Sequence, residues 1–134
     1  MLYVIYKRNH RELTYRGGQD SIVHLEANLR TTVKLADQRG RRWAFTLTNA
    51  GSNYFEDHCD LNELDRIDWM AVQARAWRSC KEAKQAEFLI ERSFPWWLVT
   101  RVGVPSQALL KRVREIVQDA DRELTVRIMK GWYS

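Results

Sequence analysis

The sequence has little cysteine and no long apolar run. Its two cysteines, Cys59 and Cys80, form no C-x-x-C pair, so two ordinary thiols are expected rather than a disulfide. No stretch approaches the ~18 consecutive apolar residues that mark a membrane-spanning helix. The first six residues, MLYVIY, carry neither the basic leader nor the cleavage site of a signal peptide. These absences predict a cytoplasmic protein that makes no membrane contact.

Several catalytic and cofactor motifs are missing as well. The sequence contains no G-x-x-x-x-G-K-S/T phosphate loop, no G-x-G-x-x-G dinucleotide motif and no H-E-x-x-H zinc motif. Histidine occurs only as His10, His24 and His58. The tripeptide His58-Cys59-Asp60 offers three metal-binding side chains, but adjacent residues do not easily converge on one ion. No metal site is expected, and nothing marks either cysteine as a nucleophilic thiolate.

The positive charge of the chain suggests an acidic partner without identifying one. The chain has 134 residues, enough for one domain with a buried core, and a formal net charge of +5. Basic residues cluster as Arg39, Arg41 and Arg42 around Gly40, and as Lys111, Arg112 and Arg114. Such clusters can neutralise the phosphates of a nucleic acid. A solvated surface is the alternative, so charge alone leaves the partner open.

Short strands separated by polar turns account for much of the chain. The clearest strand is expected over residues 43–48, where Trp43, Phe45 and Leu47 alternate with smaller or more polar residues. One face of that strand should therefore be buried. Residues 8–20 should form a loop, and Gly40 a turn. The other strands are expected over residues 2–7, 21–27, 88–90, 98–104 and 124–129.

Two helices are expected among these strands. The first should begin after Asp65 or Asp68 and bury a stripe made of Ile67, Met70, Ala71, Ala74 and Trp77. The second should begin after Ser106 as its N-cap and bury a stripe made of Leu109, Val113, Ile116 and Val117. The pattern predicts an α+β protein, mostly sheet, in a single domain over residues 1–134.

The tripeptide Gln85-Ala86-Glu87 is a candidate site because an apolar segment follows it directly. If a strand begins at Gln85, residues two apart project from one face, and an amide lies beside a carboxylate. Buried neighbours would lower the dielectric around Glu87 and strengthen its interactions. A solvated strand start is the alternative, and the tripeptide alone is a weak signal.

The surroundings of this tripeptide resemble the DarT family of ADP-ribosyltransferases in order and spacing. The similar stretches include Lys81, Lys84 to Ile90, Phe94-Pro95-Trp96 and Val102-Gly103-Val104. Others are Met1 to Ile5, Trp43 to Thr46, Thr48-Asn49-Ala50, Leu64, Ile67-Asp68-Trp69 and Trp132-Tyr133. The similarity spans nearly the whole chain and corresponds to the C-terminal two-thirds of a DarT domain.

This resemblance implies a fold, an activity and partners. The fold would be a split β-sheet of the ADP-ribosyltransferase type, with flanking helices and an NAD+ cleft between its halves. The activity would be transfer of ADP-ribose from NAD+ to thymidine in single-stranded DNA, as the toxin of a toxin–antitoxin system. The partner would be a macrodomain antitoxin that removes the mark. NAD+ would serve as co-substrate, without a metal.

The resemblance also assigns roles to residues of this sequence. Glu87 matches the catalytic glutamate of the family, and a carboxylate can stabilise the positive charge that develops on ribose when nicotinamide leaves. Gln85 would orient the ribose or the acceptor base. The loop residues Asn49, Asn53 and Tyr54 would read DNA bases, while Lys81 and Lys84 would meet phosphates. An ordinary turn and solvated lysines are the alternative interpretations.

One departure from the family pattern bears on activity. Family members carry a preceding segment with a Tyr-x-Ile-x-His-type strand and an arginine-containing stretch, which supply much of the NAD+ pocket. This sequence opens at Met1-Leu2-Tyr3, so no residue of that pocket can be assigned. Two alternatives to an active transferase follow. One is a catalytically incomplete relative that binds single-stranded nucleic acid or an antitoxin; the other is an unrelated nucleic-acid-binding domain.

Overall fold

A computed structural model describes residues 14–51, 53–74, 76, 78–120 and 124–133. The strand expected over residues 2–7 lies outside these ranges. The chain divides into a terminal unit, Met1–Asn28 with Pro95–Ser134, and a central unit, Leu29–Phe94. Within the described ranges each unit contains one three-stranded sheet, with the orders β1-β5-β6 and β3-β2-β4. The α+β class and the division of the sheet into two parts are therefore confirmed.

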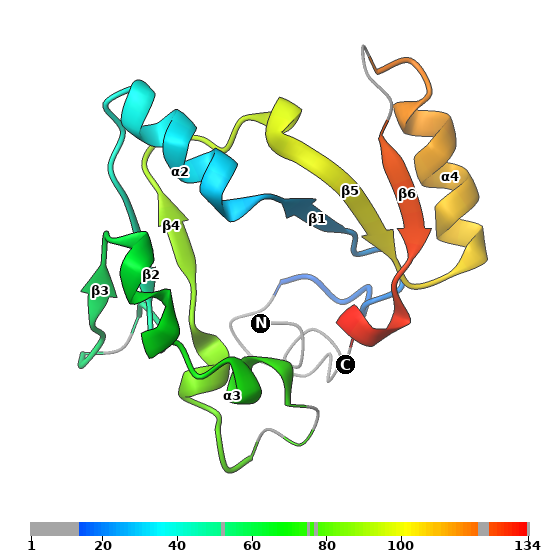
Figure 1. Cartoon of the computed structure of the whole chain (residues 1–134). Coiled ribbons are helices and arrows are strands. Elements are labelled where there is room, and N and C mark those ends of the chain that lie inside the picture. Colours follow the sequence, from blue (N-terminus) through cyan, green and yellow to red (C-terminus); the bar gives the residue numbers. More distant parts are fainter. Residues whose placement is uncertain (1–13, 52, 75, 77, 121–123, 134) are drawn as a thin grey trace. The chain divides into compact units, whose positions relative to one another are not determined.

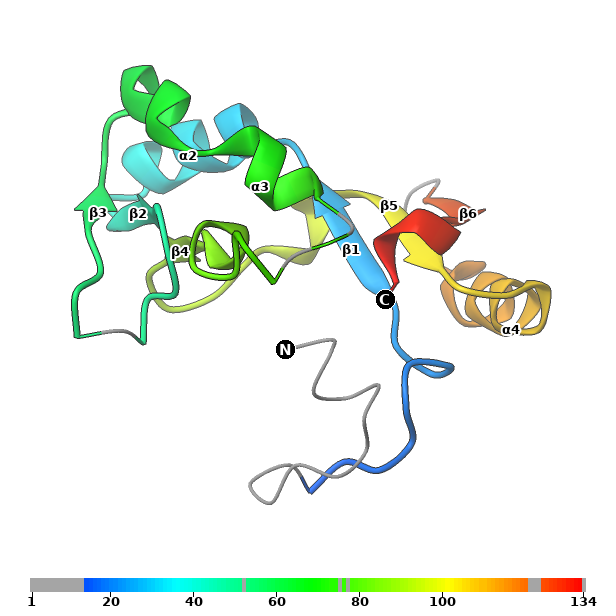
Figure 2. The same ribbon diagram turned by 90° about the horizontal axis from the view of Figure 1, so that it is seen from below.

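The terminal unit is built around strand β5 (Val99–Val104). Strand β1 (His24–Ala27) pairs with it antiparallel, and β6 (Thr125–Ile128) pairs with it parallel on the other side. A parallel neighbour requires a crossover, which helix α4 (Gln107–Val117) provides. This helix lies alongside β6 in both views (Figure 1 and Figure 2). Two 3-10 turns, η3 (Trp96–Leu98) and η4 (Lys130–Trp132), complete the unit.

The core of the terminal unit is built on three valines of β5. Its buried cluster consists of Val99, Val102, Val104, Leu110, Val113 and Val126. The predicted N-cap is confirmed, because the Ser106 hydroxyl accepts a hydrogen bond from the Leu109 amide at 3.3 Å. The predicted stripe of the helix is wrong at Ile116, which is 70% exposed, while Leu110 is buried in the cluster.

Gly103 leaves room on β5 for the aromatic residues Trp132 and Tyr133. A Cβ atom at this position would lie 2.5 Å from Cε3 of Trp132, which is too close for any side chain. The neighbouring Tyr133 hydroxyl lies 2.9 Å from the carbonyl oxygens of both Ile22 and Gly103 and donates its hydrogen bond to them. A glycine in the central strand therefore allows an aromatic pair to pack on the sheet.

His24 lies beside the same aromatic pair in an environment that favours its neutral form. Its ring meets Tyr133 edge-on, with 4.6 Å between ring centroids, and its Nε2 atom is buried without a hydrogen-bond partner. Burial lowers the pKa of His24 below its ordinary value of 6.5. The unfolded chain therefore takes up a proton at this histidine more readily than the folded chain.

We expect His24 to make the protein less stable as the pH falls. Its contribution to stability is fully present above the unfolded pKa of 6.5 and is lost as the pH falls through the lower pKa of the folded chain, because protonation then favours the unfolded chain. Urea unfolding at several pH values should show this slope, and His24→Gln should flatten it. An unchanged slope in the variant would assign the effect to another group.

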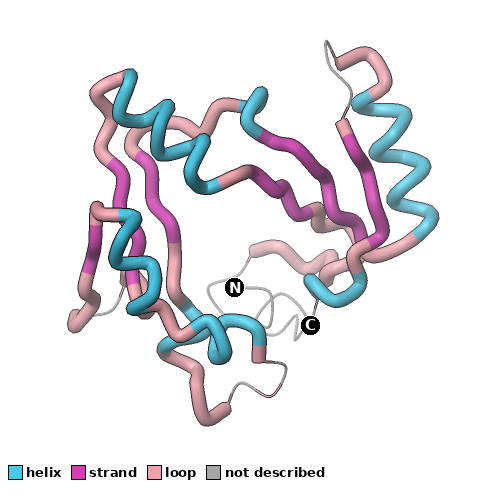
Figure 3. The backbone as a smooth tube through the Cα atoms, in the orientation of Figure 1, coloured by secondary structure: helices cyan, strands magenta, loops and turns pink. Residues whose placement is uncertain are grey.

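In the central unit, strand β2 (Trp43–Thr46) lies between β3 (Asp57–His58) and β4 (Phe88–Ile90), both antiparallel to it (Figure 3). The β2–β4 register pairs Trp43 with Ile90, Ala44 with Leu89 and Phe45 with Phe88. Two helices, α2 (Leu29–Gln38) and α3 (Trp69–Gln73), and two 3-10 helices, η1 (Leu61–Arg66) and η2 (Ala83–Gln85), complete the unit.

Three expectations for the central unit are corrected, and they concern α2, α3 and the two faces of β2. The sequence reading missed α2, although its buried residues, Thr32, Val33 and Ala36, have helical spacing. Helix α3 begins after Asp68, whose side chain accepts from the Ala71 amide at 2.8 Å, but it ends at Gln73. Met70 is 86% exposed and so belongs to no buried stripe. Trp77 lies outside the described residues.

The third correction concerns the two faces of β2. Thr46 belongs to the face expected to be polar, yet it is fully buried, as is Phe45 on the opposite face. Trp43 is only half-buried, and its indole N–H donates to Asp37 at 2.9 Å. Both faces of β2 are therefore covered at its C-terminal end, where the strand approaches the candidate site.

Candidate active site

Glu87 lies between η2 and β4, and a backbone amide holds its carboxylate. The Ala50 amide donates to Oε2 of Glu87 at 3.2 Å. Ala50 belongs to the β2–β3 loop, so this bond joins two segments that are far apart in the sequence. The side chain of Glu87 is exposed, as is that of Leu89, while Phe88 is half-buried. The expected buried surroundings of Glu87 are therefore wrong: the carboxylate is open to solvent.

Gln85 contacts the same β2–β3 loop as Glu87, but it does not share a strand face with Glu87 as the sequence predicted. It is the last residue of η2, and β4 begins only at Phe88, so Gln85 and Glu87 do not share a strand face. The Asn49 side-chain amide donates to Oε1 of Gln85 at 2.9 Å. Gln85 and Glu87 therefore bind neighbouring residues of one loop, Asn49 and Ala50.

The β2–β3 loop is ordered at this point by its own side chain. Oδ1 of Asn49 accepts a hydrogen bond from the Gly51 amide at 2.8 Å, a local turn typical of asparagine. Asn49 therefore uses both ends of its amide, one for the turn and one for Gln85. Asn53 and Tyr54 lie further along the loop, and Tyr54 is 93% exposed. Of the three loop residues predicted to read bases, the structure brings Asn49 to the Gln85–Glu87 pair.

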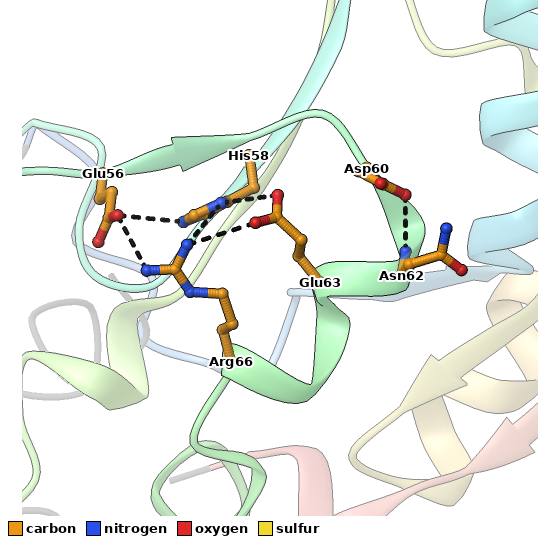
Figure 4. Close-up of polar contacts among 6 residues, drawn as sticks. All are labelled: Glu56, His58, Asp60, Asn62, Glu63 and Arg66. Carbon is orange, nitrogen blue, oxygen red and sulfur yellow. Dashed lines mark hydrogen bonds and ion pairs between the residues drawn. The ribbon is translucent and has the colours of Figure 1, made fainter.

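A charged cluster closes the other end of this loop, and the sequence reading did not anticipate it (Figure 4). His58 is buried and stacks on Phe45, with 5.3 Å between ring centroids. Its Nδ1 atom lies 3.1 Å from a Glu63 carboxylate oxygen. Arg66 lies between two carboxylates, 3.0 Å from Glu56 and 3.4 Å from Glu63. The cluster joins β3 to η1 and fixes the end of the loop that carries Asn49 and Ala50.

The two lysines predicted to meet phosphates differ in their surroundings. The Lys84 ammonium donates to the carbonyl oxygens of Val72 at 2.9 Å and Ala74 at 2.7 Å. It therefore caps the last turn of α3, where a positive charge is favourable. Lys81 is exposed. Lys84 thus has a structural role that the sequence did not reveal, because its partners lie on an earlier helix.

The described ranges contain no group of three or more His, Cys, Asp or Glu side chains arranged to hold a metal ion. No helix in the same part of the chain is both long and apolar enough to cross a membrane.

Comparison with known proteins decides the family. The sequence profile of DarT, described as ssDNA thymidine ADP-ribosyltransferase, matches residues 1–134. The chain belongs to the DarT family. A DNA ADP-ribosyl transferase of Thermus aquaticus is 35% identical over 135 residues, and one of Thermus sp. (strain 2.9) is 34% identical over 138. Both alignments cover 99% of this chain, but only 58% and 63% of the relatives.

Solved DarT structures have the same fold. Thermus sp. 2.9 DarT in complex with ADP-ribosylated ssDNA superimposes with a TM-score of 0.85 at 32% identity, covering 99% of this chain and 63% of that chain. The complex of the same protein with NAD+ also gives a TM-score of 0.85, covering 66% of that chain. The resemblance to DarT and the split-sheet fold that it implied are therefore confirmed. The chain spans less than two-thirds of these relatives.

Proposed function

We propose that this chain carries the catalytic carboxylate of an NAD+-dependent transferase that moves ADP-ribose from NAD+ to thymidine bases in single-stranded DNA. The observation that carries the proposal is Glu87, an exposed carboxylate bound by the Ala50 amide beside Gln85, in a DarT-family chain. Support also comes from Thermus sp. 2.9 DarT, a similar protein whose complexes contain NAD+ and ADP-ribosylated ssDNA.

The chemistry makes specific demands on Glu87 and Gln85. The bond between ribose C1′ and the nicotinamide nitrogen breaks, and its electron pair leaves with nicotinamide. The Glu87 carboxylate stabilises the positive charge that develops on the ribose. A new bond forms from an acceptor atom of the base to C1′, and the proton of that atom is released to solvent water. Gln85 orients the ribose or the base, because its amide offers both a donor and an acceptor.

DNA recognition would use the exposed part of the β2–β3 loop. Tyr54 offers an aromatic face on which an unpaired base can stack, worth about 1–3 kcal/mol, and Asn49 and Asn53 offer amides for its edge. Lys81 would contact phosphate, and so would Lys84, whose ammonium has one N–H donor beyond the two that bind the Val72 and Ala74 carbonyl oxygens. In the cell the protein would act as a cytoplasmic toxin, paired with a macrodomain antitoxin that reverses the modification.

The test is incubation of the protein with NAD+ and a thymine-containing single-stranded oligonucleotide, followed by mass spectrometry. We expect the mass of one ADP-ribose to be added to the oligonucleotide and nicotinamide to be released. An oligonucleotide of the same length without thymine should remain unmodified and serves as the control.

A second candidate function, favoured by the formal net charge of +5, is binding of single-stranded nucleic acid or of the antitoxin without transfer of ADP-ribose. DNA affinity that falls steeply with salt, without NAD+ turnover, would favour it. Addition of ADP-ribose by this chain would exclude it.

A further inference from the structure

The β2–β4 ladder extends one residue beyond β4 and ends in a pair joined by two hydrogen bonds, one of which goes to a side chain. Phe45 pairs with Phe88, so the next pair in the same register is Thr46 with Glu87. In an antiparallel sheet, a hydrogen-bonded pair exchanges two backbone bonds. Here the Thr46 amide donates to the Glu87 carbonyl at 2.8 Å, but the Glu87 amide donates to the Thr46 hydroxyl oxygen at 3.0 Å.

The same hydroxyl reaches the β2–β3 loop. While its oxygen accepts from Glu87, it donates its own proton to the carbonyl oxygen of Thr48. The Thr46 residue is 0% exposed, so water does not compete for these bonds. One buried hydroxyl thus fixes two backbone segments at once: the one that bears Glu87, and the one that leads two residues later to Ala50.

We infer that Thr46 is a positioning residue that holds the Glu87 carboxylate against the Ala50 amide. The carboxylate and the amide belong to separate segments, and the Thr46 hydroxyl bonds the backbone of both within two residues of their contact. The consequence for ADP-ribose transfer rests on the proposed function. The effect of the Thr46 hydroxyl on the Glu87–Ala50 contact does not depend on that function.

The opposite end of the same ladder provides a natural contrast. There the Glu91 amide donates to the Arg42 carbonyl at 2.9 Å, and the Glu91 carboxylate accepts from the Arg42 amide at 3.1 Å. A side chain again replaces a backbone partner, but Arg42 is exposed and no loop carrying a candidate catalytic group is bound. At the Thr46 end, in contrast, the side-chain hydroxyl links β2 to the backbone of Glu87 and to the β2–β3 loop.

Two substitutions separate the hydroxyl from the shape of the side chain. Thr46→Val preserves the size and the β-branch but leaves the Glu87 amide and the Thr48 carbonyl without their partner. Thr46→Ser retains the hydroxyl. Thr32→Val is the matched control, because it removes another buried threonine hydroxyl from the same unit, on α2. All three proteins are first checked for folding by circular dichroism and thermal melting.

The decisive measurement is the NMR chemical shift of the Ala50 amide, and it does not depend on activity. In the wild type, Glu87→Gln replaces the charged acceptor and should shift the Ala50 proton signal upfield. In the Thr46→Val background, we expect Glu87→Gln to leave that signal unchanged, because the contact is already lost. The Thr46→Ser and Thr32→Val backgrounds should show the wild-type change. A full wild-type change in the Thr46→Val background would overturn the inference.

Transfer kinetics then test the functional consequence. We expect Thr46→Val to lower kcat about 100-fold, as a misplaced catalytic group does, with KM for NAD+ little changed. Thr46→Ser should retain most of the activity, and Thr32→Val all of it. Equal losses in Thr46→Val and Thr32→Val would reduce the role of Thr46 to stability alone. Absence of transfer in the wild type would contradict the proposed function, while the Ala50 signal would still decide the role of Thr46.

Discussion

Glu87→Gln is expected to lower ADP-ribose transfer to single-stranded DNA by about 100- to 1,000-fold while leaving the fold intact. The replacement keeps the size of the side chain and an oxygen that can accept from the Ala50 amide, so it removes mainly the negative charge. A neutral amide cannot offset the positive charge that develops on ribose. Because the side chain is exposed, its replacement removes no core contact. Mass spectrometry of the oligonucleotide gives the rate, and thermal melting gives the stability.

Glu91→Gln is the matched control for this prediction. Glu91 is the carboxylate at the other end of the β4 ladder, and hydrogen bonds from Arg42 hold its pKa below its ordinary value of 4.5. It should lose little or no transfer activity, since its carboxylate faces Arg42 rather than the β2–β3 loop. Equal losses in the two variants would point to a general effect of charge on DNA binding. Undiminished transfer by Glu87→Gln would remove the catalytic assignment.

Local signals in the sequence predicted the local features of the fold well. Ser106 and Asp68 cap their helices as expected, because a cap requires only the residue and the next turn. Gly40 has a φ of +60° in the basic turn between α2 and β2, where glycine meets no steric cost. Helix α2 was missed although Val33 and Ala36 are buried on it, because its threonines favour strand over helix.

The sequence predicted which residues form the candidate site, but not the contacts that bring them together. Gln85 and Glu87 could be selected from the sequence, and the resemblance to DarT strengthened that selection. The reason for their proximity was wrong: they meet through Asn49 and Ala50 rather than through a common strand face. That arrangement depends on the register that places Thr46 opposite Glu87. The register between two strands that are distant in the sequence cannot be predicted from either segment alone.

The second large effect is expected from Phe45→Ala, which should lower the free energy of unfolding by about 3–5 kcal/mol. Phe45 is 2% exposed at the centre of β2, and its strand neighbours are Phe88 on one side and His58 on the other. The substitution removes a large buried ring and leaves a cavity beneath the stacked imidazole of His58. Urea unfolding followed by circular dichroism measures the loss.

Alanine substitutions at two other aromatic residues of the central unit test whether burial sets the loss of unfolding free energy. Trp43→Ala should cost less than Phe45→Ala, because the indole is half-buried and its N–H bonds Asp37 at the surface. Tyr54→Ala should cost almost nothing, since 93% of that residue is exposed. If Trp43→Ala instead proved the more damaging, Phe45 would not be the anchor of β2. The expected order, with Phe45 first, would mean that β2 is anchored by the buried ring that directly precedes Thr46 in the sequence.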